Sequence, residues 1–238
     1  MRSARTAILL ALAATFCLAP GPTPAAAQDA GRIVAVPAPA EKRARTKLRL
    51  DDGRQDFVVA LTDATGARTF QVVVLNRFTP TSNRLPFELD IIQILFPKTC
   101  QAGDTGLRAG MTFEALVYLD PSGSGDPANA MLVARQPFEV QPSDTEFQKI
   151  RLETPVTVTS GDVWVGYTNT FTASDSRLIY HAALDTSSSQ GRSWIFFNGV
   201  GSNFDGDVLV NAQFQRTIDD QGAPGNWMIR AKGRIAGA

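Results

Sequence analysis

The sequence predicts an all-β domain built as a two-sheet antiparallel β-sandwich of jelly-roll type, with a barrel as the alternative. Beyond Leu48, about a dozen short runs rich in Val, Ile, Thr, Phe and Tyr are separated by clusters of Gly, Pro, Asn, Asp and Ser. This is the pattern of short strands joined by turns. The same part of the chain contains no long run with a helical period. Without helices to cover its faces, a sheet must pack on another sheet or close on itself.

Alternation of apolar and polar side chains indicates that the sheets are antiparallel. In the run 69–75, the side chains of Phe70, Val72 and Val74 fall on one strand face. Successive side chains of a strand point to opposite faces, so this pattern gives one buried and one exposed face.

One long run departs from this alternation. Between Phe87 and Phe96 the apolar phase changes at Ile91 and Ile92, which predicts a bulge there or burial of both faces. The predicted strands span residues 56–61, 68–78, 87–96, 112–119, 131–140, 146–152, 156–159, 163–169, 178–184, 193–198, 208–214 and 227–235.

The first residues have the features of an export signal. Arg2 and Arg5 give a basic start, residues 7–18 form a nearly unbroken apolar run, and prolines precede a small-residue cleavage site. The run is shorter than the roughly 20 residues that cross a bilayer, so a removed signal peptide is favoured over an N-terminal membrane anchor. We expect cleavage near Ala27 and a secreted or periplasmic mature chain without a transmembrane segment.

The chain divides into three parts. Residues 1–27 are predicted to be the signal peptide, residues 28–47 a flexible linker rich in Ala, Pro and basic side chains, and residues 48–238 a single β-sandwich domain. The linker has too little apolar mass to repay the entropy cost of ordering it.

The zero net charge hides an uneven distribution. Residues 28–49 carry six basic and two acidic groups, a balance of +4, whereas residues 50–238 carry 15 basic and 21 acidic groups, a balance of −6. An acidic domain without basic stripes interleaved with aromatic residues is a poor nucleic-acid binder, so no nucleic-acid partner is expected. The basic arm is interpreted as a solvated tether, with contact to an anionic surface polymer or lipid as the alternative.

No catalytic residue is predicted. The single histidine, His181, is followed by Asp185 and the serines at 187–189, but the members of a catalytic triad meet through folding and not through adjacency. The chain also has no Gly-x-Ser-x-Gly elbow to expose a serine. Glu88 and Asp90 share one strand face and are interpreted as outward positions of an amphipathic strand, in preference to a glycosidase pair.

Cys100 is the one cysteine that remains after removal of the predicted signal peptide. It cannot form a disulfide within the mature chain, so packing must supply the stability. A free or buried thiol is favoured over pairing with another chain.

A polar loop between two apolar strands offers a candidate metal site. In the run 120–129, glycines let the backbone curl, and Asp120, Asp126 and Asn129 provide the hard oxygen ligands that Ca²⁺ prefers. The spacing is not that of an EF-hand, and polar Gly-rich hairpins of this composition also occur without metal.

Two aromatic side chains offer a candidate ligand platform. Trp194 and Phe196 are two residues apart in a predicted strand and therefore share one face. Sugars stack on exposed flat rings, which makes this pair the first place to look for glycan binding, although core packing is the ordinary role of such rings.

Five short patterns stand out at turns and strand starts. They are Leu50-Asp-Asp-Gly53, Asn76-Arg-Phe-Thr-Pro80, Gly161-Asp-Val-Trp-Val-Gly-Tyr167, Gly191-Arg-Ser-Trp194 and Asn226-Trp-Met-Ile-Arg-Ala231. Together, over roughly residues 48–235, they resemble the non-catalytic, jelly-roll-like β-sandwich modules of bacterial secreted proteins, including modules appended to secreted proteases. The resemblance implies binding or stabilisation without chemistry, in a group of which some members hold Ca²⁺ at loops. This chain differs from them in carrying no protease domain.

The leading hypothesis is therefore a secreted, non-catalytic binding or accessory protein whose partner is an extracellular macromolecule or glycan. The alternative is a carbohydrate-binding or weakly carbohydrate-active module, with or without Ca²⁺. A further alternative is an adhesive or structural surface subunit that assembles through its edge strands.

Overall fold

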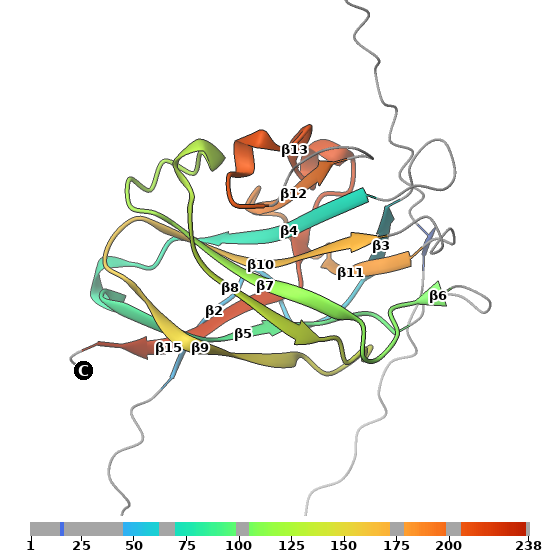
Figure 1. The fold of residues 1–238 in the computed structure, drawn as a ribbon, viewed down its shortest axis with the longest axis horizontal. Coiled ribbons are helices and arrows are strands. Elements are labelled where there is room, and N and C mark those ends of the chain that lie inside the picture. The colour runs from blue at the N-terminus through green and yellow to red at the C-terminus, as the bar shows by residue number, and fades with distance from the viewer. Residues whose placement is uncertain are drawn as a thin grey trace, which may run out of the picture.

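Three sheets of short, almost entirely antiparallel strands form the protein, and the computed structural model describes its residues 15–16, 45–61, 70–98, 105–171, 179–198 and 206–236 (Figure 1). The strands are β1 (Thr15–Phe16), β2 (Thr46–Leu48), β3 (Phe57–Leu61), β4 (Phe70–Phe78), β5 (Phe87–Ile94), β6 (Thr105–Gly106), β7 (Thr112–Asp120), β8 (Met131–Glu139), β9 (Gln148–Val158), β10 (Asp162–Phe171), β11 (Ile179–Asp185), β12 (Ser193–Asn198), β13 (Phe214–Thr217), β14 (Asn226–Trp227) and β15 (Ile229–Ile235).

Two of the layers are a six-stranded sheet in the order β13-β12-β4-β10-β7-β8 and a four-stranded sheet in the order β2-β15-β5-β9. A third sheet places β3 and β11 between β1 and β14, with the short β6 running parallel to β11. Within these described ranges the helical segments are three-residue 3-10 turns, namely η1 (Ser82–Arg84), η2 (Pro127–Asn129), η4 (Leu209–Asn211) and η5 (Asp219–Gln221).

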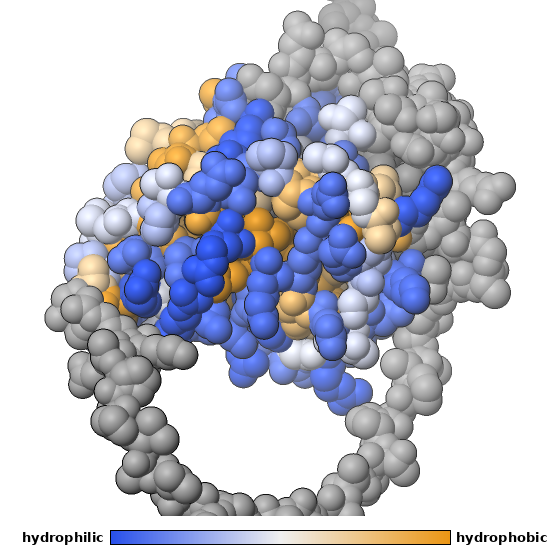
Figure 2. Space-filling view, turned by 60° about the horizontal axis from the view of Figure 1, so that its bottom comes forward, coloured by the Kyte–Doolittle hydropathy of each residue, from blue (hydrophilic) through white to orange (hydrophobic). Residues whose placement is uncertain are grey.

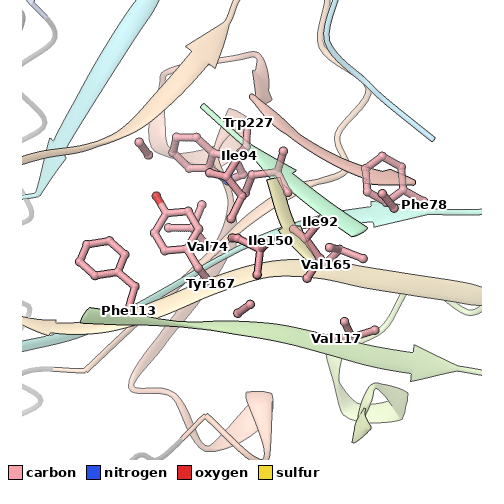
Figure 3. Packing of buried hydrophobic residues seen from close by; sticks show 14 of the residues in the cluster. Val74, Phe78, Ile92, Ile94, Phe113, Val117, Ile150, Val165, Tyr167 and Trp227 are labelled. Carbon is pink, nitrogen blue, oxygen red and sulfur yellow. The ribbon is translucent and has the colours of Figure 1, made fainter. Parts of the chain in front are cut away.

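The main hydrophobic core lies between the six-stranded and the four-stranded sheets. Alternate residues of each strand point into it, as the period of two requires, and Val74, Ile92 and Val165 are fully buried there. Figure 3 shows the rings of Phe113 and Tyr167 at one end of this cluster. The two rings stack with centroids 5.6 Å apart, so aromatic packing closes that end of the core.

A second apolar layer covers the opposite face of the six-stranded sheet. Tyr118, Trp164 and Phe196 are fully buried on this face, where the turns η2 and η4 pack against them. The Tyr118 hydroxyl donates a hydrogen bond to the carbonyl of Gly206 just before η4. Both faces of the central strands are therefore buried. The exposed face predicted for the run 69–75 is wrong, since Val73 and Leu75 are as fully buried as Val72 and Val74.

The edge strands β8 and β9 close the side of the sandwich where they lie next to each other. The side-chain amide of Gln136 donates to the carbonyl of Arg151 at 3.0 Å and accepts from the N–H of Glu153 at 2.8 Å. Gln148 makes the reciprocal pair of bonds, to the carbonyl of Glu139 at 2.7 Å and from the N–H of Gln141 at 2.8 Å. Two glutamines thus take the place of a backbone ladder between the two edges.

The predicted all-β sandwich is confirmed, whereas the jelly-roll path stays a prediction. Most predicted strands are present with ends shifted by one or two residues. The two strands expected at 146–152 and 156–159 are one strand, β9, whose pairing with β5 skips residues 152–155. The strand expected at 208–214 is wrong, because η4 occupies residues 209–211 and β13 begins only at Phe214.

Two further differences lie near the four-stranded sheet. Thr46 and Lys47, at the end of the predicted linker, belong to β2 and pair with β15. The irregularity expected at Ile91-Ile92 is a bulge one residue earlier, where Asp90 is the extra residue between Leu89 and Ile91. The predicted burial of both faces of this strand is confirmed, since Glu88 alone is half-exposed.

β1 lies within the predicted signal peptide, and its residues Thr15 and Phe16 pair with Val58 and Phe57 of β3. In the ranges that the structure describes, no helix has the length and apolar character needed to span a bilayer.

Candidate functional site

The loop that follows β7 is organised around the carboxylate of Asp120, the first predicted calcium ligand. This side chain is fully buried. Its Oδ1 accepts hydrogen bonds from the N–H and hydroxyl of Ser122, and its Oδ2 accepts from the hydroxyl of Ser124 and from the N–H of Gly125. Burial alone would raise the pKa of Asp120, but these four bonds outweigh it and hold the pKa below its ordinary value.

The other two predicted ligands lie in the same loop with different partners. The Asp126 carboxylate accepts from the N–H of Ala128 at 2.9 Å and caps η2, as side-chain oxygens at helix starts do. The Asn129 side chain donates to the hydroxyl of Ser124 at 3.0 Å. Ser124 therefore links Asn129 to Asp120 and also accepts from the N–H of Asp126 at 3.1 Å, while the Asp126 carboxylate bonds to Ala128.

The side chains of Asp120, Asp126 and Asn129 all form hydrogen bonds within the loop. Among the described residues, no three Asp, Glu, His or Cys side chains gather closely enough to hold a metal ion. The calcium hypothesis for Asp120, Asp126 and Asn129 stays a prediction. A melting temperature that rises with Ca²⁺ and falls with a chelator would support it, because a ligand that binds only the folded state stabilises that state.

The predicted aromatic pair does share a strand face. Trp194 and Phe196 stack with centroids 6.0 Å apart and ring planes 15° apart, and Trp194 also lies 5.5 Å from Trp164. They belong to the second apolar layer, in which Phe196 and Trp164 are fully buried and Trp194 is half-buried. Trp194 is therefore the member of this group whose ring has surface left for a ligand.

The residues considered for catalysis are placed as follows. The backbone of His181 lies in β11, but its side chain and Cys100 lie outside the described residues. Asp185 is fully buried and accepts from the N–H groups of Asp52 and Ser187. Its carboxylate therefore anchors the segment before β3 to the turn after β11.

The paired carboxylates of β5 lie on the outer face of the four-stranded sheet. Glu88 is half-exposed and pairs with Arg234 at 3.4 Å. Asp90 was expected to face solvent, but it is only 3% exposed. Its Oδ2 lies 2.8 Å from Arg45, 3.8 Å from Arg151 and 4.0 Å from Arg234. Asp90 therefore lies beneath arginines instead of facing an open cleft.

Six basic side chains share this outer face, and we refer to them as the basic face. They come from β2 and the residue before it, from β9 and from β15. Their alternating neighbours Leu48, Ile150 and Ala231 point into the core, so these side chains point outward. The basic face consists of Arg45, Lys47, Lys149, Arg151, Lys232 and Arg234.

Strand pairing aligns part of the basic face in a row across all four strands. Lys47 pairs with Lys232, Lys232 pairs with Ile91, and Ile91 pairs with Arg151. Neighbouring strands lie about 4.8 Å apart, so the like charges of Lys47 and Lys232 are close neighbours. Their proximity is the consequence of register and does not depend on loop conformation.

The pKa of Lys47 is lowered in these surroundings. Partial burial of the side chain lowers its pKa first, and repulsion from Arg230, Lys232 and Arg49 lowers it further. Asp51 acts in the opposite direction but is too weak to cancel the effect. Among these cations, Lys232 belongs to the basic face and is the strand neighbour of Lys47.

The sequence contains a signal for this face that the analysis by segments missed. Basic residues recur at every second position in 45–49, in 230–234 and at 149 and 151. A period of two places such side chains on one face of a strand. Residues 45–47 were instead placed in the predicted linker, and Arg49 in the domain. The signal becomes evident once 45–49 and 230–234 are known to lie near each other in one sheet.

A shallow groove of about 470 Å³ runs between β8 and the skipped residues of β9. Its apolar lining includes Val133, Ala134, Leu152 and Pro155, and Glu153 lies in the same wall. Val133 is itself the extra residue of a bulge in β8.

Comparison with known proteins gives no family for this chain. No protein-family model matches the sequence, and no curated protein matches it either.

Proposed function

We propose that this protein is a secreted, non-catalytic β-sandwich module that binds a macromolecular partner. The observation that carries the proposal is a contrast between two kinds of polar group. In the described part of the chain, hydrogen bonds hold the buried carboxylates of Asp51, Asp120, Asp162 and Asp185, and arginines surround that of Asp90. The basic face, in contrast, leaves most of its charge exposed on one sheet.

The export features of residues 1–27 support a place outside the cytoplasm. The resemblance to jelly-roll-like modules of bacterial secreted proteins supports a binding or accessory role. A sheet face suits recognition of an extended partner, because strand register fixes the spacing of the backbone positions that carry its charged side chains.

A panel of polysaccharide, ester and peptide substrates tests the absence of chemistry. We expect no turnover above the level of a heat-denatured sample of the same protein. Cleavage that copurifies with the folded protein and is lost on substitution of one buried carboxylate would overturn the proposal.

A carbohydrate-binding role centred on Trp194 is the second candidate, favoured by the half-buried position of its ring beside Phe196. It predicts binding to uncharged glycans that is insensitive to salt, since ring stacking is not a charge interaction. Trp194→Phe should then weaken glycan binding, and substitutions in the basic face should leave glycan binding unchanged.

A further inference from the structure

We propose that the basic face binds an acidic polysaccharide. This inference rests on the proposed binding function and deepens it by naming the ligand class and the surface. The ligand is a linear glycan that carries carboxylate groups along its length, and the surface is the outer face of β2, β15, β5 and β9.

The first argument is the segregation of charge. The six cations of the basic face are opposed on that face by Glu88 and Asp90, which leaves a balance of +4. The other positions of residues 45–238 carry 12 cations against 19 carboxylates, a balance of −7. A polyanion is therefore attracted to one face and repelled by the rest of the domain, which fixes its binding position.

The second argument is the type of cation. Three of the six are arginines, whose planar guanidinium groups match a carboxylate. The face already gathers three guanidinium groups around one carboxylate, because Arg45, Arg151 and Arg234 all lie within 4.0 Å of Asp90 Oδ2. Arg151 keeps 67% of its side chain exposed, so it has donors free for a second carboxylate from a ligand.

The third argument is the shape and composition of the face. The four described strands bear no large exposed apolar side chain, since the exposed Met131 and Val133 belong to β8 and the exposed Val208 and Val210 to the region of η4. There is thus no apolar wedge to enter a bilayer and no exposed ring on these strands to stack on a nucleobase. Four strands span only about 15 Å, a width that suits a single polymer chain better than an extended lipid surface.

The space-filling view agrees with this composition. Figure 2 brings forward the lower side of Figure 1, where β5, β9 and β15 lie, and hydrophilic side chains predominate there with hydrophobic areas confined between them. Glu153 comes two residues after Arg151 in β9 and lies in the wall of the groove toward β8. It therefore marks a border of the basic face.

The binding experiment uses the purified protein and polygalacturonate, which carries one carboxylate per sugar. Neutral dextran, vesicles of phosphatidylglycerol and phosphatidylcholine, and duplex DNA serve as comparison ligands at low and at physiological salt. We expect saturable binding to polygalacturonate that weakens as salt rises, because screening and counterion release govern such contacts.

A matched pair of triple variants locates the site. Lys47→Gln/Lys149→Gln/Arg151→Gln removes three exposed cations from the basic face, and Lys98→Gln/Arg108→Gln/Arg216→Gln removes three exposed cations elsewhere. Losing three exposed ionic contacts should weaken binding about tenfold in the first variant, while the second should stay within about twofold of the original. Circular dichroism confirms that both variants remain folded.

Equal effects of the two triple variants, no binding at low salt, or tighter binding to vesicles or DNA would each overturn this inference. Binding to neutral dextran alone would overturn it too but would leave the proposed binding function in place. Cleavage of polygalacturonate by the folded protein would instead overturn the proposed non-catalytic function. Failure of the acidic-polysaccharide inference and failure of the proposed function therefore give different results.

Discussion

Arg230 and Asp51, which are 179 residues apart in the sequence, form a buried two-pronged ion pair. Arg230 Nε donates to both carboxylate oxygens, at 3.0 and 2.9 Å, and Nη2 adds a further bond to Oδ1. The guanidinium carbon lies 3.7 Å from the ring centroid of Phe147. This pair fixes the segment between β2 and β3 against β15.

Asp51→Ala should destabilise the protein strongly, because it leaves the Arg230 charge buried without a partner. Removal of one member of a buried ion pair costs about 3–5 kcal/mol. Urea unfolding monitored by tryptophan fluorescence measures the change. The exposed Glu146 provides the control, since Glu146→Ala should change the free energy of unfolding by less than about 0.5 kcal/mol. Similar values for the two variants would show that the pair is not structurally important.

Asn76 links the six-stranded sheet to the C-terminal strands. Its amide donates to the carbonyls of Trp227 and Ile229 at 2.8 and 2.9 Å, and its carbonyl accepts from Ser193 at 2.7 Å. Asn76→Leu leaves these buried groups without partners, which should lower the free energy of unfolding by about 3 kcal/mol. Ser193→Ala removes fewer bonds and should cost less. The reverse order in thermal or urea unfolding would contradict this account.

Gly166 in β10 lies directly against the neighbouring strand. A Cβ at this position would meet the carbonyl oxygen of Val74 at 1.8 Å, so Gly166→Ala requires a backbone shift within the core. We expect a loss above the roughly 1–3 kcal/mol of ordinary overpacking. Gly222→Ala is the control, because that site has open space and only its positive φ opposes a side chain. It should cost about 1 kcal/mol.

The lowered pKa of Asp120 makes part of the stability depend on pH. The folded state holds this carboxyl ionised to a lower pH than the unfolded chain does. Its contribution is therefore complete above the ordinary pKa of about 4 and is lost as the pH falls through the lower folded value. Asp120→Asn should be clearly less stable than the original protein at pH 7, and the difference should shrink toward pH 3. Urea unfolding at a series of pH values measures it, and a constant difference would refute the assignment.

The two glutamines between β8 and β9 should limit self-association. Gln136→Ala/Gln148→Ala frees backbone donors and acceptors on both edges, and unpaired edges promote pairing with another chain. We expect a modest loss of stability together with a higher average mass in light scattering as concentration rises. Glu146→Ala, at an exposed position outside both strands, is the control.

Much of the fold follows from local patterns in the sequence. The alternation in 69–75 and the turn clusters located β4 and most other strands, since both signals depend on neighbouring residues. The strand predicted at 208–214 was wrong because Val208, Leu209 and Val210 have the composition of a strand. Of these three, only Leu209 is buried, and it packs in the second apolar layer. That role is decided by tertiary contacts, which local pattern does not contain.

The candidate sites show the same division. The loop holding Asp120 could be identified from its composition, but the hydrogen bonds that occupy its carboxylate depend on how the loop closes. The basic face depends on the pairing of β2 with β15, which joins residues far apart in the chain. Spacing alone indicated cations on strand faces, and only the sheet order brought those faces together.

The second apolar layer gives the molecule a front and a back. Because η2 and η4 pack on the outer side of the six-stranded sheet, this side differs from the four-stranded sheet, whose outer side carries the basic face. Molecules attached through that face to a common scaffold would all present η4 and the loop after β7 outward. Such a coating would have a uniform orientation.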